Sequence, residues 1–408
     1  MIKLQIHLDF PGCAQGKYLV KAKGYFLAVL FWADKEGPLS GWGPMGYVPI
    51  DPAGNGCFFF PNARAIPREA THVFAHCVSH DFQESEDALA EIPADFLPAD
   101  ASDRAVQRFS VLTDLHLSAK PWRVKQALKA AESDVLFLLG DSANDGEQAQ
   151  FDLFQECIRD AAPDKVIFPV PGNHDIVHPK IMPQGTENYR GFQASLLERA
   201  EAKGYPVEYH PDSLAYAVRV GRMDVIGLQC VTDGRRFLFP EGKQLDWLSR
   251  HLDETKDAAR HILLCHAPLL HHNPNRSIGM PYLNRDRELQ AILDSHANIL
   301  FLSGHTHVSP NLPRGNAEWD AERNNIYLDC GSGVETDTSN DQGLMAADWK
   351  DGCVTELTVS PDAVEICMKS IHTGLKFPRG YYRFPWTAGR MENTAASSES
   401  RAQSRFCP

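Results

Sequence analysis

The sequence predicts an α/β fold of packed layers, preceded by a small all-β, sandwich-like domain. From residue 108 onward, short apolar runs alternate with amphipathic helical segments, which is typical of layered α/β proteins. Before residue 105, short strand-like runs are separated by Gly- and Pro-rich turns without helical periodicity. A chain of 408 residues also exceeds what one hydrophobic core usually organises. We therefore expect domains at residues 1–105 and 106–372, followed by a tail at 373–408.

The N-terminal domain is predicted from strands whose residues alternate or are uniformly apolar between turn signals. The candidate strands are Lys3–Phe10, Tyr18–Ala22, Tyr25–Trp32, Cys57–Phe60 and His72–Val78. The following segment, Glu84–Asp103, is rich in Asp, Ala and Pro, and we interpret it as a linker.

The second domain is predicted to alternate strands and helices. Its expected strands are Phe109–Thr113, Val135–Leu139, Lys165–Val170, Asp224–Gln229, His261–Leu264 and Ile299–Leu302. The expected helices are Pro121–Glu132, Glu147–Ala161, Gly242–Thr255 and Asp286–Ser295, with a further inserted helix within Gly185–Tyr209. Closing strands are expected at Asn325–Asp329, Gly343–Trp349 and Cys353–Val359. The tail begins basic and aromatic, ends Ser/Ala/Arg-rich, and is predicted to be partly disordered.

Composition excludes several classes of protein. The chain has no apolar run long enough to cross a bilayer and no secretory signal at its start. Its ten cysteines include no Cys-x-x-Cys pair, which favours reduced thiols and a cytoplasmic location. A net charge of −13 argues against bulk binding to a nucleic-acid backbone, whereas a small anionic substrate drawn in by a metal remains compatible.

Five short polar segments each follow an apolar run that is predicted to be a buried strand. They read Asp114-Leu-His116, Gly140-Asp141, Gly172-Asn-His-Asp175, Cys265-His266 and Gly304-His-Thr-His307. Because ligands bind at the carboxyl ends of the strands in open α/β sheets, we expect these segments to meet at one edge. Imidazole nitrogens mixed with carboxylate oxygens are the ligands that several divalent metals accept. The set predicts a two-metal site.

In all five segments and in their order, residues 108–350 resemble the calcineurin-like metallophosphoesterase superfamily. Within it, the chain is most similar to the class III cyclic-nucleotide phosphodiesterase-like branch. The resemblance implies a layered β-sandwich core flanked by helices and a binuclear centre of divalent Mn, Fe or Zn. It implies one metal held by Asp114, His116 and His307, a second held by Asn173, His266 and His305, and a bridging Asp141.

The resemblance also implies a reaction. A metal-bridging hydroxide would attack a phosphate ester, and His174 would assist the leaving group as general acid or stabiliser. We interpret Asp175 as a carboxylate that orients an imidazole of the site. A tyrosine ligand of purple acid phosphatases is replaced here by Asn144, so the sequence gives no reason to favour ferric iron.

Several alternatives remain open at this stage. The protein is expected to hydrolyse a small phosphodiester. Hydrolysis of a phosphomonoester is the alternative, and a catalytically idle binding scaffold is the less favoured function. The N-terminal domain is a candidate for oligomerisation. His271, His272 and Arg276 either line the substrate pocket or belong to a solvated loop, and the loop is favoured. Arg235 and Arg236 either contact phosphate or are surface charges, and surface charge is favoured. His178 is a candidate for a place near the metals.

Overall fold

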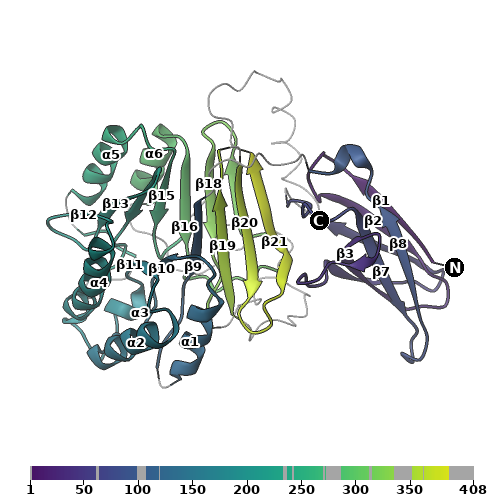
Figure 1. Cartoon of the computed structure of the whole chain (residues 1–408), viewed down its shortest axis with the longest axis horizontal. Helices are drawn as coiled ribbons and strands as arrows, with labels where there is room; N and C mark the ends of the chain where they lie inside the picture. Colours follow the sequence, from purple (N-terminus) through teal and green to yellow (C-terminus); the bar gives the residue numbers. More distant parts are fainter. Residues whose placement is uncertain are drawn as a thin grey trace.

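The computed structural model describes residues 2–60, 64–98, 107–118, 120–232, 237–240, 243–269, 272, 286–311, 315–334, 352–361 and 363–385. It divides the chain into an N-terminal β domain and a larger α/β domain that lie side by side (Figure 1). No helix within those ranges is both long enough and apolar enough to span a bilayer.

Two antiparallel sheets form the N-terminal domain. One contains β1 (Lys3–Leu8), β2 (Gly16–Lys21) and β6 (Asn55–Phe60). The other contains β3 (Leu27–Asp34), β4 (Gly37–Pro38), β5 (Gly46–Pro49), β7 (His72–Val78) and β8 (Ser85–Glu91), after which comes the short helix η1 (Ala94–Phe96). Alternate residues of β2 and β3 are buried, and Tyr18, Trp32 and Phe60 pack together between the sheets. The prediction of a linker at Glu84–Asp103 is wrong for β8, which pairs along its whole length with β7.

The α/β domain is built around two further sheets. The first has the order β11-β10-β9-β19-β20-β21 and contains β9 (Gln107–Leu112), β10 (Val135–Leu139), β11 (Val166–Val170), β19 (Cys353–Val359), β20 (Ala363–Ser370) and β21 (Lys376–Pro385). The second has the order β12-β13-β14-β15-β16-β18-β17. Its strands are β12 (Val207–Tyr209), β13 (Tyr216–Val220), β14 (Met223–Gly227), β15 (Arg260–Leu264), β16 (Ile299–Ser303), β17 (Ala317–Asp320) and β18 (Asn325–Asp329).

Side-chain alternation on the strands explains the layers. On β10, Val135, Phe137 and Leu139 belong to a core shared by both sheets, whereas Leu136 and Leu138 belong to a core shared with the helices. β10 is thus buried on both faces, as its uninterrupted apolar sequence predicts. The expected β-sandwich flanked by helices is confirmed.

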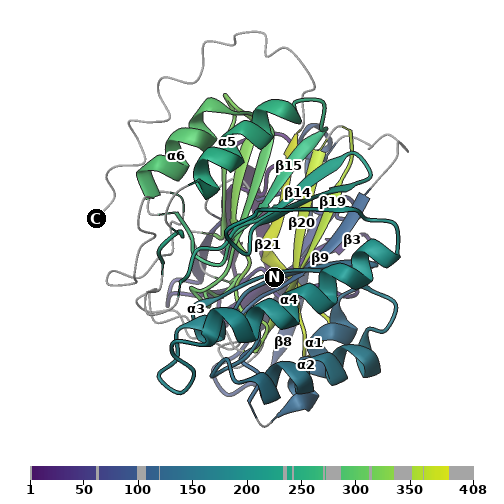
Figure 2. The ribbon, with the colours of Figure 1, turned by 90° about the vertical axis from the view of Figure 1, so that its left-hand side faces the viewer.

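The helices cover the outer faces of the two sheets. They are α1 (Pro121–Ala130), α2 (Gln148–Ala161), α3 (Asn173–Ile176), α4 (Gly185–Ala202), α5 (Gln244–Glu254) and α6 (Asp286–Ser295). Figure 2 shows α1 and α2 together at one end of the domain and α5 and α6 together at the other. The predicted bounds of α1, α2, α5 and α6 agree with these to within two residues. The helix expected in Gly185–Tyr209 ends earlier, at Ala202, and α3 was not predicted.

Strand β21 corrects the prediction that a tail begins at residue 373. It pairs antiparallel with β20 as the last strand of the first sheet. Tyr382 and Phe384 lie in the core between the sheets, and Tyr381 lies in the core of the N-terminal domain. The segments 386–408 and Gly343–Trp349 lie outside the described residues.

Candidate metal centre

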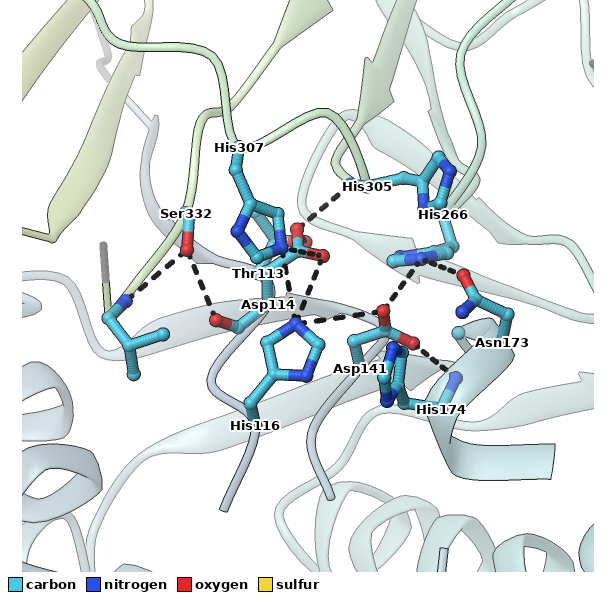
Figure 3. A network of polar contacts seen from close by, with 12 residues as sticks. Thr113, Asp114, His116, Asp141, Asn173, His174, His266, His305, His307 and Ser332 are labelled. Atoms are coloured by element: carbon cyan, nitrogen blue, oxygen red, sulfur yellow. Dashed lines mark hydrogen bonds and ion pairs between the residues drawn. The ribbon is translucent and has the colours of Figure 1, made fainter. Parts of the chain in front are cut away.

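The five predicted segments meet in space, each on the loop that follows a strand. Asp114 and His116 follow β9, Asp141 follows β10, and Asn173 starts α3 after β11. His266 follows β15, and His305 and His307 follow β16. Their side chains gather at one place and point toward one another (Figure 3). The structure therefore places these residues together, as the sequence predicts.

One group of potential ligands surrounds Asp114. The Asp114 Oδ1 atom lies 3.2 Å from His307 Nε2 and 3.9 Å from His116 Nε2. The two histidine Nε2 atoms are 3.1 Å apart. The other oxygen, Oδ2, accepts hydrogen bonds from the Thr113 hydroxyl at 2.6 Å and the His305 main-chain N–H at 2.9 Å. The protein thus fixes one carboxylate oxygen and leaves the other facing the two imidazoles.

A second group surrounds Asp141. Its Oδ1 accepts a hydrogen bond from the His174 main-chain N–H at 2.7 Å. Its Oδ2 lies 3.3 Å from His266 Nε2 and 3.8 Å from His116 Nε2, so a single oxygen faces both groups. The Asn173 Oδ1 atom lies 3.2 Å from the same His266 nitrogen. His305 completes this group, because one nitrogen of His305 is within 4.8 Å of ligand atoms of Asp141 and His266.

The positions of these metal-ligating atoms suit coordination of a metal ion better than hydrogen bonds among the side chains. Among the described residues, the buried atoms Asp114 Oδ1 and His305 Nε2 have no hydrogen-bond partner, which is costly for polar atoms. Ligand atoms about 2.0–2.2 Å from one ion lie roughly 3–3.5 Å from each other in tetrahedral or octahedral geometry. Four separations of 3.1–3.3 Å within the two groups have this size, whereas the 3.9 Å between Asp114 Oδ1 and His116 Nε2 is longer.

Two main-chain oxygens fix the tautomers of the histidines. His266 Nδ1 donates to the Leu139 carbonyl at 2.7 Å, and His174 Nδ1 donates to the Asn144 carbonyl at 2.7 Å. Since a carbonyl oxygen only accepts, the proton of each neutral ring sits on Nδ1 and Nε2 keeps its lone pair. This arrangement is typical of histidines that bind metals or transfer protons through Nε2.

The interpretation of Asp175 as an orienting partner of an imidazole is wrong. Its two oxygens accept hydrogen bonds from the main-chain N–H groups of Ala143 and Gly172, each at 2.9 Å. Asp175 therefore ties the loop after β10 to the loop after β11. Burial and the neighbouring charge of Asp141 raise the pKa of Asp175 to about 7.

The electrostatics of the ligand groups follow from burial and mutual proximity. Burial opposes ionisation of Asp114, but the nearby charges of His307 and His266 favour it and lower the pKa of Asp114 to about 2. Burial, and then the charge of His266, lower the pKa of His305 to about 3. A neutral His305 and an ionised Asp114 are the forms that coordinate metals.

The backbone of the site is unusual in its dihedral angles. Asp114, His116, Asp141, His305 and His307 all have positive φ, between 42° and 69°. Side chains with a Cβ atom rarely adopt this left-handed region, and such residues cluster at functional sites. These strained conformations occur where each loop turns abruptly at the end of its strand. The turns direct the side chains of the site toward one another.

A cavity of about 290 Å³ opens beside the Asp114 group. Its walls include His116, His174 and His307, so three candidate functional imidazoles face it. The remaining lining residues are Leu115, Leu117, Ser118, Lys120, Arg123, Asn144 and Val334. Lys120 and Arg123 belong to no motif that the sequence displays, and only their position at the start of a helix after His116 could have indicated them.

The other predicted pocket residues lie elsewhere or outside the described ranges. His178 pairs with Asp145 at 3.3 Å. His272 stacks on Tyr327 with a ring distance of 3.8 Å and contacts Glu318. Arg235, Arg236, His271 and Arg276 are outside the residues that the structure describes. Phe237, which the sequence did not single out, packs against the ring of His305 at 4.5 Å.

Residues 107–309 match the family model of the calcineurin-like phosphoesterases. No curated protein gives a significant match to the sequence.

Among solved structures, PhoD has a TM-score of 0.41 at 11% identity, over 96% of this chain and 92% of that one. GAP50, described as the anchor in the inner membrane complex of Plasmodium, has a TM-score of 0.44 at 15% identity, over 70% and 90%. A predicted phosphoesterase from Streptococcus pneumoniae has a TM-score of 0.33 at 13% identity, over 69% and 99%. With its family match, its ordered motifs and its converging His and Asp side chains, this chain belongs to the calcineurin-like metallophosphoesterase superfamily.

Proposed function

We propose that this protein is a binuclear metal-dependent hydrolase that cleaves phosphate esters, with phosphodiesters as the preferred class. The observation that carries the proposal is the position of Asp141 Oδ2 between His266 and His116, at 3.3 and 3.8 Å. A single carboxylate oxygen that faces two ligand groups can offset the repulsion between two dications about 3.5–4 Å apart.

The chain offers a complete ligand set for two divalent ions of Mn, Fe or Zn. Asp114, His116 and His307 would hold one ion, Asn173, His266 and His305 would hold the other, and Asp141 would contact both. When bound, the ions would neutralise phosphate oxygens and lower the pKa of a coordinated water. The hydrogen bonds that Thr113, His305 and His174 donate to the two carboxylates keep these ligands in place.

His174 is placed to handle the proton of the leaving group. Its Nδ1 proton is engaged by the Asn144 carbonyl, so Nε2 is the atom that would hold and deliver a proton. The ring lies edge-on to His116 with a centroid distance of 4.6 Å and lines the cavity. Because an alkoxide is a poor leaving group, a proton donor at this place would matter most for substrates with basic leaving groups.

The test is hydrolysis of bis-p-nitrophenyl phosphate and p-nitrophenyl phosphate by full-length protein loaded with Mn²⁺. We expect faster turnover of the diester. Asp141→Asn should lower bound metal and reduce turnover by at least about 100-fold, since even indirect ligand partners contribute 10–100-fold. Asp160→Asn, which alters an exposed carboxylate of α2, is the matched control and should change neither quantity.

The outcomes separate the possible functions. Preference for the monoester would keep the metal-dependent reaction and assign the protein to the phosphatases. Absence of turnover for both esters, together with full metal content in Asp141→Asn, would contradict the proposal and favour a binding scaffold. Oligomerisation through the N-terminal domain remains a separate prediction.

A further inference from the structure

Two basic residues line the cavity next to the metal centre, and the described part of its wall contains no acidic residue. Lys120 and Arg123 lie at the start of α1, four and seven residues after His116. Among the lining residues that the structure describes, none is Asp or Glu. The chain as a whole has 53 acidic and 40 basic residues, so the described part of this wall has the opposite balance of charge.

No carboxylate of the described residues pairs with either cation. Within the described ranges, the side chains of Lys120 and Arg123 form no ion pair, and the guanidinium of Arg123 lies over the ring of Trp122, at 5.5 Å. Lys125, on the same helix, behaves differently, because it pairs with Asp160 at 2.6 Å. The cations that face the cavity are thus left available, while one that faces α2 is neutralised.

We propose that Lys120 and Arg123 bind a second phosphoryl group of the substrate, so that the preferred substrate is an ester with two phosphoryl groups. This inference rests on the proposed function, in which the ligand groups around Asp114 and Asp141 receive the reacting phosphate. The metal ions would already neutralise that phosphate, so two additional cations serve a different anionic group.

The geometry of the chain limits where the second group lies. Four residues of extended chain span at most about 14 Å, so Lys120 lies near the Asp114 group. A phosphoryl group on the same small molecule as the reacting phosphate can therefore reach both sites. The planar guanidinium of Arg123 suits phosphate oxygens through paired N–H donors, and Lys120 adds a point charge.

The experiment uses a matched pair of ligands that differ by one phosphate. Binding of thymidine 3′,5′-bisphosphate and thymidine 5′-monophosphate to the full-length, Mn²⁺-loaded protein is measured by calorimetry. The p-nitrophenyl esters of the same two 5′-phosphates are then compared as substrates. The variants are Lys120→Gln/Arg123→Gln and, as control, Lys129→Gln, an exposed lysine at the far end of the same helix.

We expect the wild-type protein to bind the bisphosphate about 30-fold more tightly than the monophosphate, because the second phosphate would form two charge-assisted contacts. The double variant should reduce this preference to about threefold, and the control should retain it. The preference of the wild type should also weaken as salt is raised, because partly exposed charges are screened. Among the esters, the loss should appear mainly as a higher KM for the doubly phosphorylated one.

Failure of the inference differs from failure of the proposed function. Equal binding of the two nucleotides by the wild type, or an equal loss in Lys129→Gln, would overturn the inference. Hydrolysis of neither ester would overturn the proposed function, while the calorimetric preference would still decide the role of Lys120 and Arg123.

Discussion

Gly172 lies so close to Asp141 that a Cβ atom on Gly172 would be 2.2 Å from both the main-chain nitrogen and Oδ1 of Asp141. Real Cβ atoms do not approach other atoms at that distance. The contact brings the loop after β11 against the loop after β10, and it allows the His174 N–H to reach Asp141 Oδ1. The absence of a side chain at residue 172 is thus a condition for the geometry of the bridging carboxylate.

Gly172→Ala should therefore damage the metal centre. The added methyl group must displace Asp141 or the loop, and overpacking of this kind costs about 1–3 kcal/mol. We expect a lower urea midpoint and reduced bound Mn²⁺, measured by denaturation and metal analysis. Gly191→Ala is the matched control, because its Cβ would meet no atom within 4 Å and the residue lies inside α4. It should stabilise the protein by about 0.5–1 kcal/mol. Equal metal loss in both variants would contradict the argument.

His174→Gln should reduce turnover while leaving metal content intact. Removal of a general acid typically costs 10²–10⁴-fold in rate. The loss should be larger for an alkyl phosphodiester than for bis-p-nitrophenyl phosphate, because p-nitrophenolate leaves without a proton. Rates for both esters and the bound metal would be measured on the same preparation.

A metal-ligand role for His174 gives a different result. His174 lies in a cluster with His116 and Asp141 that could hold an ion. If His174 were a ligand, His174→Gln would lose metal and would slow both esters equally. The comparison of leaving groups therefore distinguishes the two roles.

The metal centre was predictable because its signals are local. Each ligand follows an apolar strand directly, as Asp141 follows Val135–Leu139, and strand ends of a sheet gather at one edge. The role of Asp175 was not predictable, because its partners are main-chain N–H groups of Ala143 and Gly172, and main-chain groups carry no sequence signal.

The strands β8 and β21 escaped prediction for different physical reasons. Among the described strands, β8 lies at the edge of its sheet and pairs with β7 alone. Its sequence, Ser-Glu-Asp-Ala-Leu-Ala-Glu, is therefore polar enough to look like a linker. β21 contains Pro378 and Gly380, residue types that are uncommon inside strands, and this masks its strand character. Only tertiary packing between two domains explains why Tyr381 and Tyr382 are buried on opposite sides of it.

A buried pair far from the ligands should make stability depend on pH. His251 Nε2 lies 3.0 Å from Asp224 Oδ2, and both side chains are buried. Burial lowers the pKa of His251, but the hydrogen bond and charge of Asp224 outweigh it and raise the pKa. Folding thus favours the protonated ring. Its stabilising effect is present below the ordinary histidine pKa of about 6.5 and is lost as pH rises through the raised pKa.

Urea denaturation of wild type and His251→Gln across pH 5.5 to 9 would measure this effect. We expect the variant to be less stable by about 1.5–3 kcal/mol at the acidic end, with the difference shrinking as pH rises. The control is His76→Gln, which breaks an exposed contact with Asp87 and should cost less than about 1 kcal/mol throughout. A difference that grows with pH would show that the ring is neutral in the folded protein.

Trp42 links the two domains through β21. Its ring meets Tyr381 edge-on at 5.2 Å, Lys376 Nζ lies 4.9 Å from its centre, and its Nε1 donates to Glu69 at 3.0 Å. The residue is 6% exposed. Trp42→Ala should cost about 3–5 kcal/mol, because a large side chain is removed from a packed interface.

Trp122→Ala provides the matched comparison for this truncation. Trp122 is 59% exposed on α1, and its substitution should change the free energy of unfolding by less than about 0.5 kcal/mol. Urea midpoints of the two variants and the wild type would be compared. Similar midpoints for both variants would mean that the N-terminal domain contributes little to the stability of β21. A selective loss in Trp42→Ala would mean that the N-terminal domain supports the sheet from which the loop of Asp114 emerges, and so supports the metal centre indirectly.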